Sequence, residues 1–304
     1  MKKTVDIVLA TFNGEKYIAE QLKSIICQTY ADWRLLISDD GSTDLTVDVV
    51  NYYCALDSRI QLVNKSRQGG VVSNFNKALC FVKSDCVMLC DQDDVWKKDK
   101  IEIMFYKLNE LELLYGKSCP LFIFSDAEVV DSDLSIIEKS IYQARNLNPL
   151  NNLDPRFLLW QCSALGCTSI FNNALYKIAF PLPSKIPMHD QWLALVAAIH
   201  GHVYYHPIPT IFYRQHQNNV VGAKKKNLKN WLKSSFVNLN NTKKDVVFCY
   251  RHIDILKGSM LSNKTGLCMK LEFISGSVIP FLKERKVFGV IFLLLFFFDG
   301  KGWK

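Results

Sequence analysis

The chain has 304 residues, of which 49% are hydrophobic, and its formal net charge is +8 at pH 7. This length and apolar content suit one large domain, or a domain with an appendage. The positive charge is compatible with a nucleic acid, an anionic membrane or a phosphorylated substrate. The sequence contains neither a zinc-ligand spacing nor an RNA-binding motif, so no nucleic acid is expected as a partner. The ten scattered cysteines include no C-x-x-C pair, which favours a reducing cytosol over a disulfide framework.

Residues 5–10 form the first apolar segment, which contains Asp6 and is not followed by a cleavage-like site. We therefore expect a first strand rather than a signal peptide. Similar apolar runs recur three times before residue 100, and a helical pattern follows each run. Such alternation predicts a doubly wound, mostly parallel α/β sheet with right-handed crossovers. The expected strands are 7–10, 33–37, 60–63 and 86–90.

The rest of the predicted sheet has a less regular pattern. A helix is predicted over 98–115 and a strand over 121–126. Polar, proline-containing sequence then predicts a loop over the site between residues 132 and 154. The remaining expected elements are a strand at 165–171, a short helix at 174–180, a helix carrying Leu193, Val196, Ala197 and Ile199, and strands at 203–205 and 210–213.

Asp91, Asp93 and Asp94 place three carboxylates within four positions, directly after the predicted strand 86–90. In open α/β sheets, ligands bind at the carboxyl ends of the strands. Close carboxylates repel one another unless a cation joins them, and a divalent metal carrying a phosphorylated ligand is the usual solution. The alternative is an N-cap for the next helix, but one Asp would be enough for a cap. The spacing therefore favours a metal site.

Two further polar motifs follow the first and second predicted strands, at residues 11–15 and 38–44. The carboxyl ends of parallel strands meet at one edge of a sheet. We therefore expect side chains from three motifs to be neighbours despite their separation in the sequence: Asn13, Glu15, Asp40 and Asp93.

These three motifs, in this order, closely resemble family 2 inverting glycosyltransferases with the GT-A fold. Two later segments resemble the bacterial rhamnosyltransferase-like branch, and the resemblance covers roughly residues 5 to 222. It implies a GT-A, Rossmann-like sheet and a nucleotide-diphosphate sugar as the donor. The motifs are Thr11-Phe12-Asn13-Gly14-Glu15, Ser38-Asp39-Asp40-Gly41-Ser42-Thr43-Asp44, Asp91-Gln92-Asp93-Asp94, Met188-His189-Asp190-Gln191-Trp192 and Tyr213-Arg214-Gln215-His216-Gln217-Asn218-Asn219.

The resemblance implies that Asp40 accepts a hydrogen bond from the ring N–H of uracil or thymine, which suits an acceptor-only carboxylate. Backbone around Ala10 and Phe12, together with Glu15, would hold the base and the ribose. Tyr is common where Phe12 stands, and the Phe12 ring would still pack on the base. Loop and capping chemistry is the expected role of the two other acids in that loop, Asp39 and Asp44.

Asp94 matches the metal-binding end of the family's D-x-D-type motif, and Asp93 is expected near the ribose or metal-bound water. Mg²⁺ or Mn²⁺ there would neutralise the diphosphate leaving group. His216 matches a position that completes the metal shell or touches the diphosphate. A solvent-facing His is the alternative.

Asn76 matches a donor-binding Asn of the family, although Phe75 stands where family members often carry Arg. A plain helix-surface Asn is the alternative.

Asp190 is the expected general base, because a carboxylate near the acceptor can take the hydroxyl proton as that oxygen attacks the anomeric carbon. The motifs place no second carboxylate as a covalent nucleophile, so a single displacement with inversion is expected. His189 and Trp192 are expected on the acceptor side, with Trp192 stacking on a sugar. A helix cap is the alternative for Asp190, and core packing is the alternative for Trp192.

The rhamnosyltransferase-like resemblance implies dTDP-L-rhamnose as the donor, with UDP-galactose or UDP-glucose as alternatives. The implied acceptor is a lipid-linked oligosaccharide of a surface polysaccharide such as O antigen or capsule. Three other functions fit the sequence less well. A sugar-1-phosphate nucleotidyltransferase would need a Gly-rich loop with a basic residue at the position of residues 11–15. A phosphoacceptor signalling domain would be much shorter, and a dinucleotide-binding module would carry G-x-G-x-x-G after the first strand.

The composition changes after residue 222. We expect a catalytic domain over 1–222, with a donor half of about 1–100 and an acceptor half of about 101–222, and a basic helical extension over 223–304. Its apolar segment 287–298 is flanked by Lys and Arg and is shorter than the ~20 residues of a spanning helix. Membrane association in the interface is therefore expected, on the cytoplasmic face of the inner membrane. The alternative is a helix buried against protein.

Overall fold

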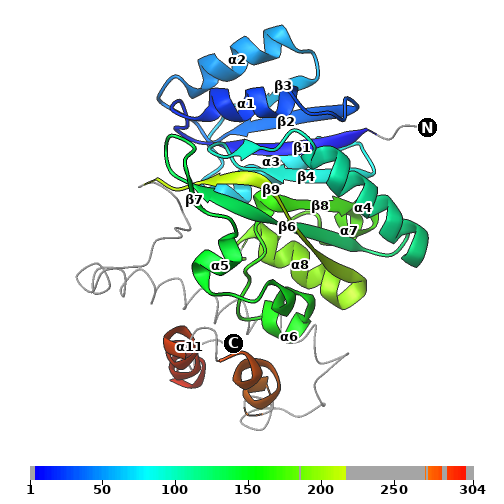
Figure 1. Ribbon diagram of the computed structural model, residues 1–304, viewed down its shortest axis with the longest axis vertical. Coiled ribbons are helices and arrows are strands. Elements are labelled where there is room, and N and C mark those ends of the chain that lie inside the picture. The colour runs from blue at the N-terminus through cyan, green and yellow to red at the C-terminus, as the bar shows by residue number, and fades with distance from the viewer. Residues whose placement is uncertain (1–3, 185, 217–270, 272, 283–285, 299–304) are drawn as a thin grey trace.

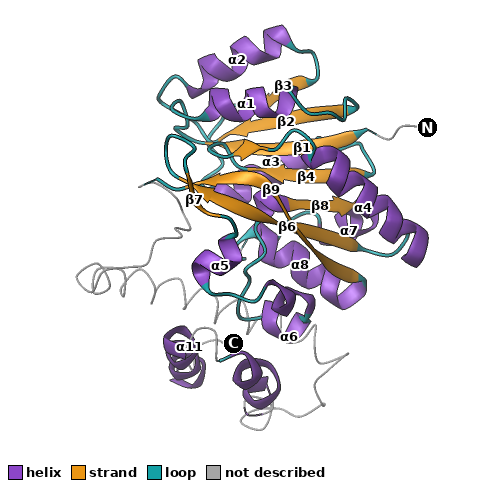
Figure 2. Ribbon diagram, viewed as in Figure 1, coloured by secondary structure: helices purple, strands orange, loops and turns teal. Residues whose placement is uncertain are grey.

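The computed structural model describes residues 4–184, 186–216, 271, 273–282 and 286–298 (Figure 1). Within these ranges the strands join into one curled sheet, with helices α1 and α4 in front of it and α3 behind it in the view shown (Figure 2). The predicted boundary near residue 222 and most of the basic extension lie outside the described residues.

The first four strands confirm the predicted parallel unit. They pair in the order β3-β2-β1-β4, all parallel. Each is followed by a helix or, after β4, by the acidic loop 91–94 and then α4. The elements are β1 (Val5–Thr11), α1 (Ile18–Ile26), β2 (Trp33–Asp39), α2 (Thr46–Leu56), β3 (Ile60–Asn64), α3 (Val71–Leu79) and β4 (Cys86–Cys90).

The sheet continues beyond β4 as β8-β6-β9-β5, with β7 on the edge of β6. Here β8 runs antiparallel to both of its neighbours, whereas β6 and β9 are parallel. The whole sheet is therefore mixed, and the expected parallel pairing holds without exception only in the donor half. The elements are β5 (Val95–Trp96), α4 (Lys100–Tyr115), β6 (Leu121–Val130), β7 (Ile136–Glu138), α5 (Ile141–Arg145), α6 (Pro155–Leu158), β8 (Ser169–Asn172), α7 (Asn173–Ala179), α8 (His189–His200) and β9 (His202–Arg214), with 3₁₀ turns at Pro149–Leu153 and Gly166–Thr168.

Three sequence-based predictions in this half were wrong. The segment 132–154 is no plain loop, because it forms β7, α5 and a 3₁₀ turn. The strand predicted at 165–171 begins only at Ser169, after a 3₁₀ turn. The two strands predicted at 203–205 and 210–213 are one strand, β9. Its partner β6 shifts register opposite the proline-containing stretch, and such irregularities are where a strand tolerates proline.

The parallel registers bring three strand ends together. Thr11, at the end of β1, pairs with Asp39 of β2, and Leu9 pairs with Cys90 of β4. Apart from Ala10, the apolar residues of β1, β2 and β4 are buried. Continuous apolar runs without alternation predict such burial for a sheet that is covered on both faces. The motifs that follow β1, β2 and β4 consequently share one edge.

The C-terminal segment contains α11 (Lys286–Phe298) and packs one face on protein. Phe292 is buried and lies 5.4 Å from Trp160, measured between ring centroids. The opposite face leaves Val290 and Leu294 about half exposed, at 53% and 54%. Within the described ranges, no helix combines the length and the apolar character that crossing a membrane requires.

Candidate functional site

The turn after β1 is tied to the acidic loop by Gln92. Its Oε1 accepts the backbone N–H of Phe12 at 2.9 Å, and its Nε2 donates to the Phe12 carbonyl at 3.1 Å. The Phe12 ring is 44% exposed, so its face is open to a planar ligand. Sequence analysis gave Gln92 no role. Its position inside the acidic motif, directly before Asp93, was the available signal.

Two acids of the loop after β2, Asp39 and Asp44, have the structural role expected for them. Asp39 accepts the Thr11 hydroxyl at 2.8 Å, and Asp44 accepts the N–H groups of Glu15 and Thr46 at 3.1 and 3.0 Å. Both acids therefore hold the loop together. Glu15 has a similar role, because its Oε2 accepts the N–H of Leu45 at 2.9 Å.

Asp40 lies 7% exposed under the loop that precedes α3. Its Oδ1 accepts the N–H groups of Gln68 and Gly69, the latter at 2.9 Å, and its Oδ2 accepts that of Gly70 at 2.8 Å. An ionised carboxylate offers about four acceptor positions. Oδ2 therefore keeps room for one further donor, such as a ring N–H.

Two asparagines of α3 face different parts of the chain. Asn74, 2% exposed, donates to the carbonyls of Thr11 and Ser38 at 3.1 and 2.9 Å and thereby joins the ends of β1 and β2. Asn76 instead accepts the N–H of Leu182 at 2.9 Å. The structure thus brings Asn74, which sequence analysis missed, to the strand-end edge, whereas Asn76 contacts the chain between α7 and α8.

The acidic loop presents two differently placed carboxylates. Asp93 Oδ2 lies 2.8 Å from Nε2 of His216, in the partly exposed outer layer. Asp94 is 1% exposed, and its Oδ1 accepts the N–H of Arg214 at 3.2 Å. Arg214 also donates from Nε to the Asp93 carbonyl at 2.9 Å. The end of β9 therefore fixes both acids.

Asp91 completes the cluster. One oxygen each from Asp91 and Asp94 and the sulfur of Cys167 lie within 4.8 Å of one another. Burial, then Asp93, then Asp190 raise the pKa of Asp91 to about 7. Burial, followed by Asp93 and Asp91, raises the pKa of Asp94. These distances place Asp91 in the acidic cluster together with Asp94.

Lys100 lies behind this cluster. Its side chain is fully buried, its Nζ donates to the Cys167 carbonyl, and the ammonium lies 3.8 Å from the centroid of the Trp96 ring. Burial lowers the pKa of Lys100 to about 8, so the ammonium is still the main form at neutral pH. Lys100 thus places a buried cation close to Asp91 and Asp94.

The cluster fits a hard divalent cation. In the described part of the chain, Asp94 Oδ2 is buried without a hydrogen-bond partner, beside the weakly donating thiol of Cys167. A buried carboxylate oxygen normally has a partner, and carboxylates are the ligands that Mg²⁺ and Mn²⁺ prefer. Asp94 is the residue best placed to hold such an ion, with Asp93 and His216 on the outer side.

The predicted acceptor residues lie at the start of α8. Asp190 Oδ2 accepts the N–H of Gly166 at 3.3 Å, and its Oδ1 accepts that of Gln191 at 2.7 Å. Because Gly166 directly precedes Cys167 of the cluster, this contact brings the predicted base to the acidic cluster, and Asp190 contributes to the raised pKa of Asp91. The same carboxylate thus bonds within the first turn of α8 and lies beside the cluster.

The two neighbours of Asp190 are less accessible. His189 is 3% exposed, and its ring lies 4.0 Å from that of Phe75, measured between centroids. It fills a packing position, which an acceptor reaches only if its surroundings move. The indole N–H of Trp192 donates to the Ala179 carbonyl at 2.9 Å, and the side chain is partly buried.

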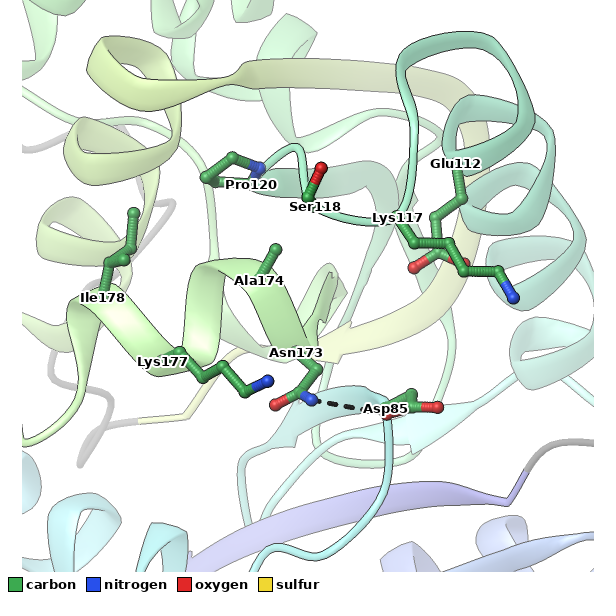
Figure 3. Close-up of a pocket in the computed structure, with 9 residues that line it drawn as sticks. All are labelled: Asp85, Glu112, Lys117, Ser118, Pro120, Asn173, Ala174, Lys177 and Ile178. Carbon is green, nitrogen blue, oxygen red and sulfur yellow. Dashed lines mark hydrogen bonds between the residues drawn. The ribbon is translucent and has the colours of Figure 1, made fainter.

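A cavity of about 510 Å³ lies away from this chemistry (Figure 3). It is bordered by Asp85, which precedes β4, by Pro120, which precedes β6, and by the first turn of α7. These positions mark the opposite edge of the sheet from the acidic loop. Its polar lining is of mixed charge, and Asn173 donates to Asp85 at 3.4 Å. The strand-end cluster, and not this cavity, is the candidate active site.

Comparison with known proteins identifies relatives of this chain. Residues 6–144 match the model of glycosyl transferase family 2. The dTDP-rhamnosyl transferase RfbG of Shigella flexneri is 32% identical over 231 residues, which cover 71% of this chain and 74% of that protein. The UDP-Glc:alpha-D-GlcNAc-diphosphoundecaprenol beta-1,3-glucosyltransferase WfgD of Escherichia coli is 26% identical over 196 residues, covering 63% and 69%.

A solved structure shares the fold. The mannosyltransferase PcManGT from Pyrobaculum calidifontis, in complex with GDP-Man and Mn²⁺, has a TM-score of 0.57 to this chain at 14% sequence identity. The match covers 99% of this chain and 88% of that one. At that identity the likeness concerns the fold alone, which is an α/β fold of the GT-A type with a mixed sheet.

Proposed function

Because this chain belongs to glycosyl transferase family 2, we propose that it transfers L-rhamnose from dTDP-L-rhamnose to a lipid-linked glycan, with inversion at the anomeric carbon. The acceptor is an intermediate of a bacterial surface polysaccharide such as O antigen or capsule. A UDP-hexose transferase, for galactose or glucose, is the second candidate. The observation that carries the proposal is that a further carboxylate, Asp190, is bonded to the turn whose Cys167 belongs to the metal-suited acidic cluster.

The nucleotide occupies the edge formed by the ends of β1 and β2. Asp40 accepts the ring N–H of thymine or uracil through the spare capacity of Oδ2. Phe12 offers an exposed ring for the base, and Ala10 and Glu15 border the ribose. Asn76 supports the donor site from outside, because its contact with Leu182 connects α3 to the acceptor side.

A divalent ion is the proposed cofactor, held by Asp94 and His216 with Asp93 toward the ribose. When bound, Mg²⁺ or Mn²⁺ supplies positive charge that stabilises the diphosphate as the leaving group. The raised pKa values of Asp91 and Asp94 support this assignment, since buried acids that repel one another favour a cation among them. The bound Mn²⁺ in the structural relative PcManGT points the same way.

Asp190 is the proposed general base. Its carboxylate takes the proton of an acceptor hydroxyl while that oxygen forms a bond to the anomeric carbon. The bond from this carbon to the diphosphate breaks, and its electron pair leaves with the nucleotide. Gly166 N–H holds Oδ2 of Asp190 and thereby orients the carboxylate. His189 packs against Phe75 and so holds the start of α8 in place. Trp192 borders the acceptor sugar.

The choice of sugar rests on two relatives. RfbG, named a dTDP-rhamnosyl transferase, is more similar to this chain than WfgD, whose name gives UDP-Glc as its donor. The diphosphoundecaprenol in the name of WfgD supports a lipid-linked acceptor. For such an acceptor we place the enzyme peripherally on the cytoplasmic face of the inner membrane, where the exposed apolar face of α11 supplies a contact.

A donor panel tests the function. Purified full-length protein is incubated with dTDP-L-rhamnose, UDP-glucose, UDP-galactose and GDP-mannose, each with Mg²⁺, Mn²⁺ or EDTA, and release of the nucleoside diphosphate is measured. Metal-dependent turnover is expected for dTDP-L-rhamnose above the others. Preference for a UDP-hexose would select the second candidate, and no turnover or binding of any nucleotide sugar would refute the proposal. The anomeric configuration of the product decides between inversion and retention.

A further inference from the structure

Lys100 is an unusual lysine. It occupies the first residue of α4, where a long charged side chain could reach solvent, yet its side chain is fully buried. Burial of an ammonium is strongly unfavourable unless it is compensated. The neighbouring Lys97 is partly buried and Lys98 is exposed, so the segment as a whole does not force burial. The local contacts of Lys100 must therefore offset this penalty.

Two contacts surround the ammonium, and they come from different parts of the site. The Trp96 ring below it belongs to β5, directly after Asp94 and Val95. The Cys167 carbonyl that accepts from Nζ belongs to the 3₁₀ turn Gly166–Thr168. Asp91 and Asp94 also lie close enough to this ammonium to raise the pKa of Lys100 against the effect of burial. Lys100 thus joins the acidic loop to this turn.

The turn leads directly to the proposed base. Gly166 N–H donates to Asp190 Oδ2 at 3.3 Å. A Cβ on Gly166 would lie 2.6 Å from His189 Nε2, so the turn is packed tightly against the start of α8. The carbonyl of Gly166 accepts the Ser169 hydroxyl at 2.7 Å. A shift of the turn would therefore move the Asp190 carboxylate.

We propose that Lys100 is a positioning residue for glycosyl transfer: its buried ammonium holds the turn Gly166–Thr168 against the acidic loop and so sets the distance from Asp190 to the bound donor. This inference rests on the proposed function. It adds a residue that touches neither substrate nor base but connects the donor half of the site to the acceptor half.

The test compares Lys100→Met, which keeps an unbranched chain but removes charge and donor, with Lys98→Met on the exposed surface two residues earlier. Circular dichroism and thermal unfolding establish folding. Binding of the nucleoside diphosphate with Mn²⁺, kcat, and KM for donor and acceptor are then measured. Because misplacement of a reacting group by 1 Å can cost about 100-fold, kcat of Lys100→Met should fall by about that factor while nucleotide affinity changes little. Lys98→Met should match the wild type.

Lys100→Arg and Gly166→Ala extend the test. Arginine keeps the cation and a donor, so it should recover part of the lost kcat. Gly166→Ala moves the same turn, so its effect and that of Lys100→Met should not add in the double variant. If Lys100→Met does not fold, Lys100→Gln and Gly166→Ala carry the comparison, with the same separation of kcat from nucleotide affinity expected.

Three outcomes overturn the inference: wild-type kcat in a folded Lys100→Met, parallel loss of kcat and nucleotide affinity, or wild-type kcat in both fallback variants. Parallel loss would assign Lys100 to general support of the fold. These outcomes are distinct from failure of the proposed function, which would already be apparent as a wild-type protein that neither binds nor uses a nucleotide sugar.

Discussion

Asp93 Oδ2 lies 2.8 Å from Nε2 of His216, although 123 positions separate the two residues. The His216 ring also stacks on that of Tyr17, with 5.0 Å between centroids. The guanidinium of Arg214 lies 4.5 Å from the same Tyr17 ring. The loop after β4, the turn before α1 and the end of β9 thus meet at one place, which is the outer side of the proposed metal site.

This relationship predicts the effect of His216→Ala. Loss of an imidazole that holds or orients a metal ligand typically weakens metal binding about 10- to 100-fold. Calorimetric titration of Mn²⁺ and nucleotide should show a loss of that size, and Asp94→Ala should abolish the Mn²⁺ dependence. His200→Ala, at the exposed end of α8, is the control. An unchanged Mn²⁺ titration in Asp94→Ala would refute the metal assignment.

Asp190→Asn should separate binding from chemistry. Removal of a general base lowers the rate by about 10²- to 10⁴-fold, whereas an amide keeps the size of the side chain and an oxygen for the Gly166 N–H. Transfer should therefore be lost with nucleotide-sugar affinity nearly intact. Asp48→Asn, an exposed acid in the first turn of α2, is the matched control. Equal loss of donor binding would make Asp190 structural.

The metal-free protein should become less stable as the pH rises from about 4 to about 7. Asp91 has a pKa of about 7 in the folded chain against an ordinary value of 3.8, so the folded state holds this proton more tightly than the unfolded state. The stabilising contribution of the protonated Asp91 is complete below pH 3.8, the ordinary pKa, and is lost as the pH rises through about 7, the pKa in the folded chain. Thermal unfolding in EDTA at several pH values measures this trend. Asp91→Asn should flatten it, and an identical slope in that variant would contradict the prediction.

Gln92→Ala should weaken the donor site without touching the acids. The variant frees both backbone groups of Phe12 from their contacts with one side-chain amide. Two hydrogen bonds of about 1 kcal/mol each predict a rise in donor KM of about tenfold or more if the turn must be ordered for binding. Steady-state kinetics with Gln143→Ala, exposed on α5, as control will measure this. An unchanged KM would assign Gln92 to folding alone.

The C-terminal helix offers a test of membrane association that leaves packing intact. Val290 and Leu294 are exposed, so Glu at both positions should reduce sedimentation with anionic vesicles while the unfolding temperature stays the same. Phe292→Ala should instead destabilise the protein by about 3–5 kcal/mol, because the ring is buried beside Trp160. Wild-type sedimentation of the folded double-Glu protein would exclude this face as a membrane contact.

Several features of the site were predictable because they depend on local sequence. The apolar runs of β1, β2 and β4 predicted buried parallel strands, and parallel strands bring their carboxyl ends together. The order of the motifs therefore predicts that Asp40 and the acidic loop share one edge, and the registers confirm it. The loop roles of Asp39 and Asp44 also follow from local bonds within a few residues, and the structure agrees.

Other features depend on contacts between distant segments, which no local pattern encodes. Val95–Trp96 is too short a strand for periodicity, and it forms because β9 pairs with it. Asn74 and Asn76 have the same residue type on one short helix, and only the packing of α3 decides that Asn74 meets the strand ends. No local pattern distinguishes Lys100 from the exposed Lys98, and only the packing of α4 buries its side chain.

Periodicity and motif order are local properties, so they predict the alternating α/β plan, the family and the acids at the strand ends. The mixed sheet, the packing of one face of α11, and the place of Asp190 beside the acidic cluster instead arise from long-range contacts. The burial that leaves an oxygen of Asp94 without a partner, and that encloses Lys100, is likewise created when separate elements pack together and exclude water.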